Sequence, residues 1–270
     1  MNIPFLKMHG AGNDFILVDD RDLSFPMNDS AWMAAVSARK TGAGCDGIIL
    51  IQPSNKADFR MRFVNPDGRE VEMCGNGARC AARLAHEIGA APAEMTIETA
   101  AGTLRARAQG TDVLLYMTPP ADFRLKESIE VDGRTVTFSF VNTGVPHAIV
   151  EVEDLDAFDV EGTGRAVRRH EHFSPEGTNA DFITVAGPNS LRLRTYERGV
   201  EAETLACGTG VAASALIAAK LALVEAPVQV SVASGDTLTV NFALTEAGAE
   251  DVTLLGPTAH VYKGTLEYGE

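Results

Sequence analysis

Two short segments carry the residue types that proton transfer at a carbon centre would use. Cys74 opens the sequence Cys-Gly-Asn-Gly, and Cys207, 133 residues later, opens Cys-Gly-Thr-Gly; residues 80–88 and 212–223 follow as helix-forming runs. A thiol at a helix N-terminus meets unpaired backbone N–H groups and the positive end of the helix dipole. We therefore expect the pKa of both thiols to fall from about 8.5 toward neutrality. The adjacent glycines let the backbone approach a ligand and bind an anion such as a carboxylate.

A matched pair of such thiols suits a racemase that uses two bases. One cysteine, as thiolate, would remove an α-proton, and the other, as thiol, would deliver a proton to the opposite face. Because this proton is weakly acidic, the carbanion needs focused N–H dipoles in a site without water. The sequence has no pyridoxal phosphate motif and no Cys/His cluster with zinc spacing, so we expect neither cofactor nor metal. We interpret Cys80 as helix core and leave Cys45, in a Gly-rich loop, unassigned.

The elements around these segments repeat once along the chain. A strand at residues 61–65 precedes a turn at residues 66–68, and residues 191–198 form its counterpart. Downstream, residues 95–108 read as a strand-turn-strand unit, and residues 228–242 repeat that pattern. The period is far too long for a solenoid, so the sequence indicates a duplicated domain.

The predicted fold class is α+β, with two pseudo-symmetric domains. Each domain is a mostly antiparallel, barrel-like sheet around a central helix that begins at the Cys-Gly-x-Gly segment. Residues 1–118 form the N-terminal half with Cys74, and residues 119–270 form the C-terminal half with Cys207. The last strand is available to pair back with the first half. We expect the duplication to bring the two cysteine loops to one cleft, where sites prefer to form.

The amino-acid composition of the chain argues against several classes of function. The chain has 23 Lys+Arg against 37 Asp+Glu, a formal net charge of −14, which argues against a nucleic-acid surface. No apolar run approaches the ~18 residues that cross a bilayer, and the N-terminus lacks a signal-peptide pattern. Four cysteines in 270 residues are not a disulfide framework. We therefore expect a cytoplasmic protein with reduced thiols and a small-molecule substrate.

Seven segments, in order over essentially the whole chain, resemble those of the diaminopimelate epimerases, the cofactor-independent epimerases of lysine and cell-wall precursor synthesis. They are residues 9–15 (HGAGNDF), 65–68 (NPDG), 73–80 (MCGNGARC), 146–147 (PH), 177–179 (GTN), 196–199 (YERG) and 206–210 (ACGTG). Any one segment is weak evidence, but all seven in order are very specific. The resemblance implies interconversion of LL- and meso-2,6-diaminopimelate in a cleft between two α/β domains, commonly by a homodimer.

The resemblance also implies a role for each matched residue. Cys74 and Cys207 would be the catalytic acid/base pair. Four residues at the helix entrances would bind the reacting α-carboxylate: Gly75, Asn76, Gly208 and Thr209. Five more would hold the amino groups and the distal carboxylate: Asn13, Asn65, Asn179, Glu197 and Arg198. His147 and Glu197 would tune the pKa values of the thiols.

Two positions differ from the family's commoner pattern. Many members have asparagine where this chain has Val145, and glutamine where it has Gly47. Both differences remove a polar contact to substrate, for which another residue or water would compensate. A proline or hydroxyproline racemase is the nearest alternative, although Arg198 would have no use without a distal carboxylate. Isomerases of the phenazine-pathway type share the fold but lack the cysteine pair. From another class, the chain could be a thiol redox switch or binding module.

Overall fold

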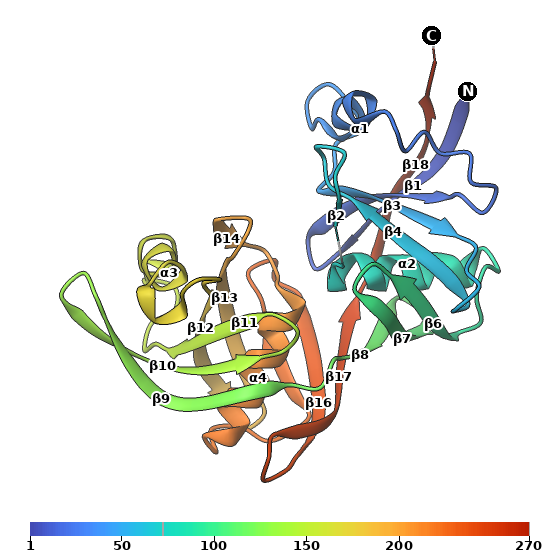
Figure 1. The fold of residues 1–270 in the computed structure, drawn as a ribbon. Coiled ribbons are helices and arrows are strands. Elements are labelled where there is room, and N and C mark those ends of the chain that lie inside the picture. The colour runs from blue at the N-terminus through green and yellow to red at the C-terminus, as the bar shows by residue number, and fades with distance from the viewer. Residues whose placement is uncertain (72, 270) are drawn as a thin grey trace. The chain divides into compact units, whose positions relative to one another are not determined.

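The computed structural model describes residues 1–71 and 73–269 and divides into two compact units (Figure 1). Unit 1 contains Met1–Leu115 together with Gly256–Glu270, and unit 2 contains Tyr116–Leu255. The chain thus leaves unit 1 once and returns to it for its last strand.

Unit 1 is a mostly antiparallel sheet that wraps a helix. Its strands are β1 (Asn2–Gly10), β2 (Asn13–Asp19), β3 (Gly47–Gln52), β4 (Phe59–Val64), β5 (Glu70–Val71), β6 (Glu94–Thr99), β7 (Gly102–Gln109), β8 (Asp112–Tyr116) and β18 (Ala259–Glu267). The pairs β18/β1, β1/β2, β3/β4 and β6/β7 are antiparallel, whereas β2/β3 and β4/β6 are parallel. The C-terminal strand therefore pairs with the N-terminal strand, as Figure 1 shows.

Unit 2 repeats this order of pairings. Its strands are β9 (Ala121–Val131), β10 (Arg134–Asn142), β11 (Pro146–Glu151), β12 (Asn179–Gly187), β13 (Ser190–Glu197), β14 (Ala202–Thr204), β15 (Val228–Ser231), β16 (Thr237–Leu244) and β17 (Ala249–Pro257). The pairs β9/β10, β10/β11, β12/β13 and β15/β16 are antiparallel, whereas β11/β12 and β13/β15 are parallel. The predicted α+β class with two pseudo-symmetric domains is confirmed.

The central helices, α2 (Gly75–Glu87) and α4 (Gly208–Lys220), have the same length and the same start. Cys74 and Cys207 are their N-caps, with extended backbone. Both helices begin earlier than residues 80 and 212, because the Gly-x-Gly segments form the first turn. α4 is buried over nearly its whole circumference and ends at Lys220, before residue 223, since Ala222 takes a left-handed backbone (φ 57°).

Each unit also holds a second helix that the sequence analysis did not predict. These are α1 (Ser30–Ser37) in unit 1 and α3 (Val160–Arg168) in unit 2; unit 2 adds a 3-10 turn, η1 (Glu171–Phe173). An aspartate caps each helix: Asp29 accepts from the backbone N–H of Trp32, and Asp159 accepts from that of Gly162. Both helices are short (8 and 9 residues), so their apolar residues repeat too few times to indicate a helix in the sequence.

The interior of α4 contains one polar side chain whose removal should stabilise the fold. Ser214 is fully buried, and its hydroxyl makes no hydrogen bond with any described residue. An unpaired buried hydroxyl costs about 1–3 kcal/mol. We expect Ser214→Ala to raise the free energy of unfolding by about 1 kcal/mol, measured by urea denaturation. A loss of stability would contradict this description of the core.

Candidate active site

In unit 1, Cys74 lies at the start of α2 beside an asparagine pair. Its Sγ donates to Asn13 Oδ1 at 3.4 Å, and Asn76 Nδ2 donates to the same oxygen at 3.3 Å. Asn13 Nδ2 in turn donates to Asp46 Oδ2 at 2.6 Å. Because an amide has one acceptor and one donor end, this last bond turns the Asn13 carbonyl toward the thiol. Cys74 is half-buried, whereas Cys207 is buried.

A cluster of charged side chains contacts Asp46 and so holds the Asn13 side chain in this orientation. Arg39 bonds to Asp14 at 2.7 Å and also contacts Asp46, while buried Lys7 pairs with Asp14 at 2.6 Å. Burial raises the pKa of Asp14, but hydrogen bonds from Arg39 and Lys7 outweigh it and lower that pKa to about 2. The sequence analysis missed this cluster, whose members lie in three separate segments.

In unit 2, a chain of polar contacts runs inward from Cys207. The Cys207 Sγ lies 3.3 Å from Thr209 Oγ1, which lies 3.0 Å from His147 Nε2. The opposite ring nitrogen, Nδ1, lies 2.6 Å from Asp181 Oδ2. Thr195 Oγ1 donates to the other carboxylate oxygen at 2.7 Å. The pattern therefore joins three predicted site residues to Asp181 and Thr195, which the sequence analysis missed.

The protonation of Cys207 differs from the prediction. Burial, followed by the carboxylates of Glu197 and Asp181, raises the pKa of the Cys207 thiol well above its ordinary value. The Gly210 backbone N–H opposes this shift without cancelling it. The expected fall toward neutrality is thus wrong for Cys207, because desolvation and two nearby negative charges outweigh the helix N-terminus. In this form Cys207 is a thiol, the state of an acid.

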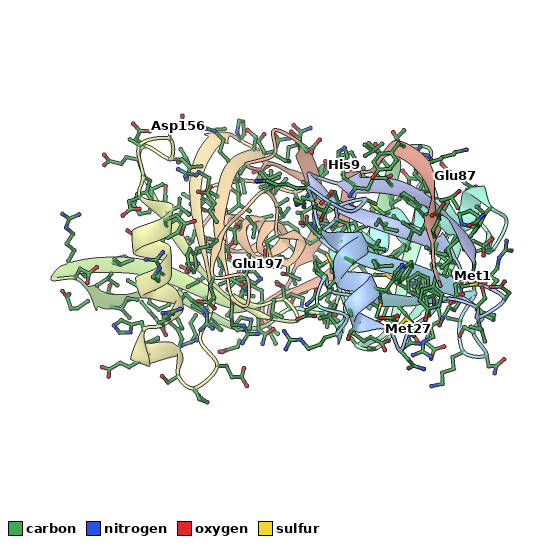
Figure 2. The ribbon with its side chains drawn as sticks, turned by 90° about the horizontal axis from the view of Figure 1, so that it is seen from above. Met1, His9, Met27, Glu87, Asp156 and Glu197 are labelled. Atoms are coloured by element: carbon green, nitrogen blue, oxygen red, sulfur yellow. The ribbon has the colours of Figure 1, made fainter. Side chains whose placement is uncertain are left out.

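Glu197 is the other pKa-tuning candidate, and it lies at the end of β13 within unit 2 (Figure 2). Its Oε2 accepts from Thr204 Oγ1 at 2.9 Å. Burial raises the pKa of the Glu197 carboxyl; Thr204 and His147 lower it, and Asp181 raises it. The structure thus brings Glu197 and His147 together around Cys207.

Removal of the Glu197 charge should make Cys207 more reactive. A negative charge disfavours the thiolate, so Glu197→Gln lowers the thiol pKa and increases the thiolate fraction at any pH below it. In a Cys74→Ala background, we expect alkylation of Cys207 by iodoacetamide at pH 8 to accelerate about tenfold, one pKa unit. Peptide mapping by mass spectrometry measures the alkylation of Cys207 separately from that of the other cysteines. An unchanged or slower rate would contradict the assignment of Glu197.

Asn179 and Arg198 lie together at one end of unit 2. Asn179 Oδ1 accepts from the Arg198 backbone N–H at 2.8 Å, and its Nδ2 donates to the Pro146 carbonyl at 3.0 Å. Asn179 therefore fixes the backbone that carries Arg198. The Arg198 guanidinium is partly exposed. Its Nη1 donates to the Glu176 carbonyl at 3.3 Å and lies 4.0 Å from the Glu176 carboxylate. Such a guanidinium can turn to grip a carboxylate.

The remaining predicted residues stand at the helix entrances and a turn. The first intrahelical hydrogen bonds run from the Ala78 N–H to the Cys74 carbonyl and from the Val211 N–H to the Cys207 carbonyl. The N–H groups of Gly75 and Gly208 come before these donors, in the first turn, where backbone N–H groups have no partner within the helix. A Cβ at Gly75 would meet nothing within 4 Å among the described residues. Asn65 is half-buried in a turn, where its backbone bonds to Arg69 and Gly68.

The two departures from the family pattern have different surroundings. A Cβ at Gly47 would lie 2.2 Å from Phe63 Cε2, so the aromatic ring fills the space that a longer side chain would need. Val145 is half-buried, and its carbonyl accepts from the Thr143 N–H at 3.2 Å.

The two other cysteines lie in the core. Cys80 is fully buried on α2, as predicted, and burial raises the pKa of its thiol to about 12. Cys45 is buried against Ser37, 3.4 Å between Sγ and Oγ, and burial likewise raises its pKa. Within residues 1–71 and 73–269, no group of three or more His, Cys, Asp or Glu could hold a metal ion. Over the same ranges, no helix is long and apolar enough to cross a membrane.

Comparison with known proteins adds evidence from sequence. The family model described as diaminopimelate epimerase matches residues 5–123 and 139–257. The diaminopimelate epimerase of Aquifex aeolicus is 42% identical over 274 residues, which cover 97% of each chain. That of Chlorobaculum tepidum is 43% identical over 263 residues, covering 96% of this chain and 99% of the relative.

Solved structures show the same fold at low identity. A phenazine biosynthesis protein of the PhzF family from Bacillus anthracis has a TM-score of 0.75 at 17% identity, covering 99% of this chain and all of that one. A probable proline racemase from Agrobacterium radiobacter K84 has a TM-score of 0.72 at 18% identity, covering 99% and 93%. The architecture is therefore shared by proteins with different names.

Proposed function

Because this chain belongs to the diaminopimelate epimerase family and is an enzyme of that family, we propose that it interconverts LL- and meso-2,6-diaminopimelate without a cofactor. The observation that carries the proposal is the pair of thiols at matched positions, each the N-cap of a central helix. Thiols at such positions stand beside backbone N–H groups that favour a carboxylate.

In the proposed reaction the two thiols act on one α-carbon. Cys207, which burial and carboxylates keep protonated, starts as the acid. Cys74 acts as the base once it has lost the proton that it donates to Asn13 Oδ1. The Cys74 thiolate takes the α-proton, and the C–H electron pair stays on the substrate as a carbanion conjugated with its carboxylate. Cys207 then gives its proton to the other face and becomes a thiolate. The enzyme is left with its two protonation states exchanged, ready for the reverse direction.

The proposed substrate contacts divide by chemistry. Backbone N–H groups at Gly75 and Gly208, with Asn76 and Thr209, would stabilise the charge that develops on the reacting carboxylate. Arg198 would hold the distal carboxylate with a two-pronged contact. Glu197 can pair with an ammonium group, and Asn13, Asn65 and Asn179 would complete the polar lining without adding charge.

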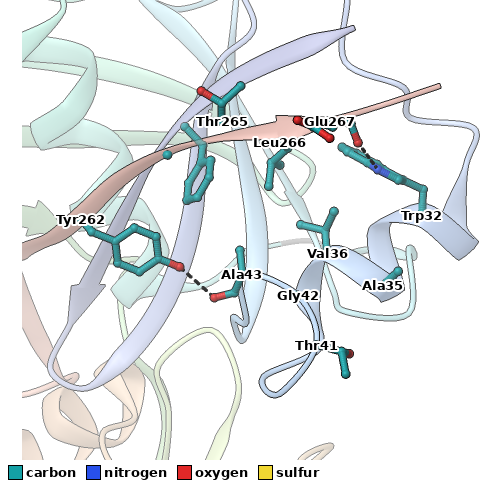
Figure 3. Close-up of a pocket in the computed structure, with 12 residues that line it drawn as sticks. Trp32, Ala35, Val36, Thr41, Gly42, Ala43, Tyr262, Thr265, Leu266 and Glu267 are labelled. Carbon is teal, nitrogen blue, oxygen red and sulfur yellow. Dashed lines mark hydrogen bonds between the residues drawn. The ribbon is translucent and has the colours of Figure 1, made fainter. Parts of the chain in front are cut away.

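We propose further that the chain works as a homodimer in the cytoplasm, in the biosynthesis of lysine and peptidoglycan precursors. One face of unit 1 supports the dimer: Val261 and Tyr262 are 53% and 42% exposed on β18, next to a pocket lined by Phe5, Trp32 and Leu266 (Figure 3). Exposed apolar side chains beside a pocket are typical of an interface. Sedimentation at micromolar concentration should show two copies; a monomer throughout would exclude the dimer.

Chiral chromatography tests the proposed activity directly. Purified protein with reductant should convert LL-diaminopimelate to a mixture with the meso isomer, without added pyridoxal phosphate. Activity on proline or 4-hydroxyproline instead would replace the proposed substrate but keep the two-thiol chemistry. No conversion of any amino acid, with both thiols shown to be reduced, would overturn the proposal in favour of a thiol switch or binding module.

A further inference from the structure

The proposed reaction gives no role to a buried carboxylate near Cys207. Asp181 is the third residue of β12 and is fully buried, as is its partner His147 on β11. A buried carboxylate is costly unless it is paired and hydrogen-bonded. Asp181 is hydrogen-bonded on both oxygens, to His147 Nδ1 at 2.6 Å and to Thr195 Oγ1 at 2.7 Å.

The arrangement of donors gives these contacts a direction. A carboxylate only accepts, so His147 must carry its proton on Nδ1, the nitrogen that faces Asp181. In the neutral ring, Nε2 is then an acceptor, and the hydroxyl of Thr209 must donate to it. A hydroxyl has a single proton, so Thr209 has none left for the sulfur at 3.3 Å. Cys207 must therefore be the donor in that contact, which requires its thiol form.

The first turn of α4 is built against this pair. A Cβ at Gly210 would lie 2.6 Å from Asp181 Oδ1 and 3.3 Å from His147 Cε1. Only a residue without a side chain lets the helix start approach the carboxylate and the imidazole so closely. The geometry around Asp181 is thus tied to the helix turn that presents Cys207.

The duplicated unit has no equivalent of this device. Phe15 pairs with Gly47 and Leu17 pairs with Ile49 in unit 1, as His147 pairs with Asn179 and Ile149 pairs with Asp181 in unit 2. The counterparts of His147 and Asp181 are therefore the apolar residues Phe15 and Ile49. A Cβ at Gly77, the counterpart of Gly210, would lie 2.8 Å from Ile49 Cδ1 and 3.5 Å from Phe15 Cζ, where unit 2 has a carboxylate and an imidazole. The feature therefore distinguishes the Cys207 half from the Cys74 half.

We propose that Asp181, held by Thr195, is a positioning residue that fixes the tautomer of His147 and, through Thr209, holds Cys207 in its hydrogen-donating thiol form. The inference rests on the proposed function for its purpose: one member of the thiol pair must begin the reaction as the acid. The charged groups that face Cys207 are Glu197 on β13, Asp181 on β12 and, when protonated, His147 on β11.

The test replaces the charge with a group of the same shape. An Asp181→Asn amide can donate to Nδ1 and so favour the Nε2–H tautomer, which reverses the direction of the contacts toward Cys207. In protein labelled with ¹⁵N-histidine, we expect His147 to be the Nδ1–H form at pH 8 and to lose that form in Asp181→Asn. The His147 signal is assigned by its loss in His147→Gln.

A second readout follows the sulfur itself. In a Cys74→Ala background, the pH of half-maximal Cys207 alkylation should fall by about one unit in Asp181→Asn, because the thiol loses its enforced donor role and a nearby negative charge. Thr195→Val should lower the pH of half-maximal Cys207 alkylation by a smaller amount. This variant replaces Asp181→Asn in the test if Asp181→Asn does not fold. With Cys74 restored, Asp181→Asn should lower kcat about a hundredfold, within the range for losing a positioned acid, with KM little changed.

Asp20→Asn is the matched control. Asp20 is also a buried carboxylate with two donors, the Phe25 N–H and Gln52 Nε2, but it belongs to unit 1 and has no contact with the His147 network among the described residues. Asp20→Asn should lower the free energy of unfolding without changing the tautomer of His147 or the pH of half-maximal Cys207 alkylation. An Nε2–H or doubly protonated His147 in the wild type, or a tautomer unchanged by Asp181→Asn, would overturn the proposal. Because both readouts work without turnover, they separate this failure from a failure of the proposed epimerase activity.

Discussion

Cys74→Ala and Cys207→Ala should each reduce the rate of epimerisation by roughly a thousandfold or more, because each removes a general acid or base whose contribution is about 10²–10⁴-fold. Neither substitution should unfold the chain. Each cysteine caps its helix through extended backbone and makes no side-chain capping bond, so the helix start does not depend on the sulfur. The measurement is conversion of LL- to meso-diaminopimelate, with circular dichroism as the check on the fold.

Cys80→Ala is the matched control for both substitutions. It removes the same atom from α2, but from a fully buried position in the core. We expect a modest loss of stability and unchanged turnover. A Cys74→Ala or Cys207→Ala enzyme that kept its full rate would show that the reaction does not need two thiols.

Arg198→Ala should raise KM for diaminopimelate about a hundredfold, since a hydrogen bond to a charged group contributes about 1.5–3 kcal/mol. The effect belongs mainly to binding, because the distal carboxylate is remote from the reacting carbon. Arg198→Lys should fall between wild type and Arg198→Ala, as lysine keeps the charge but loses the planar fork. Steady-state kinetics with both variants separates KM from kcat.

Lysine supplies the matched substrate, because it is diaminopimelate without the distal carboxylate. Exchange of its α-proton in D2O should be slow in the wild type and equally slow in Arg198→Ala. If Arg198→Ala bound diaminopimelate as tightly as the wild type, another cation would have to hold the distal carboxylate.

The sequence was informative where chemistry and backbone geometry depend on the same residues. The Cys-Gly-x-Gly segments predicted both central helices, and the repeated pattern predicted the pseudo-symmetric α+β fold. The helix starts were misplaced by several residues because glycine is a poor helix former in general. Here the first turn needs glycine, most clearly at Gly210, for close approach to neighbouring groups.

The protonation of Cys207 could not be predicted from the same segment. A helix N-terminus lowers a thiol pKa, but burial and, after it, two carboxylates from β13 and β12 raise the pKa of Cys207. Both effects arise only after the sheet has formed. Asp181 offered one signal, a charged residue inside the apolar run of residues 179–185. In a strand that is buried this completely, such a residue must have a partner. Which partner it has depends on strand register, here Thr195 opposite it and His147 on the neighbouring strand.

The central claim, that two thiols act on opposite faces of one α-carbon, is tested most directly by isotope incorporation. LL-diaminopimelate is incubated with reduced enzyme in D2O, and the isomers are separated early and examined by proton NMR. We predict that the meso product carries deuterium at the inverted carbon while the remaining LL substrate keeps its protium, because the base that removes the proton is not the acid that delivers the deuteron. Equal deuteration of both isomers, or meso product that retains the original proton, would indicate a single base and contradict the account.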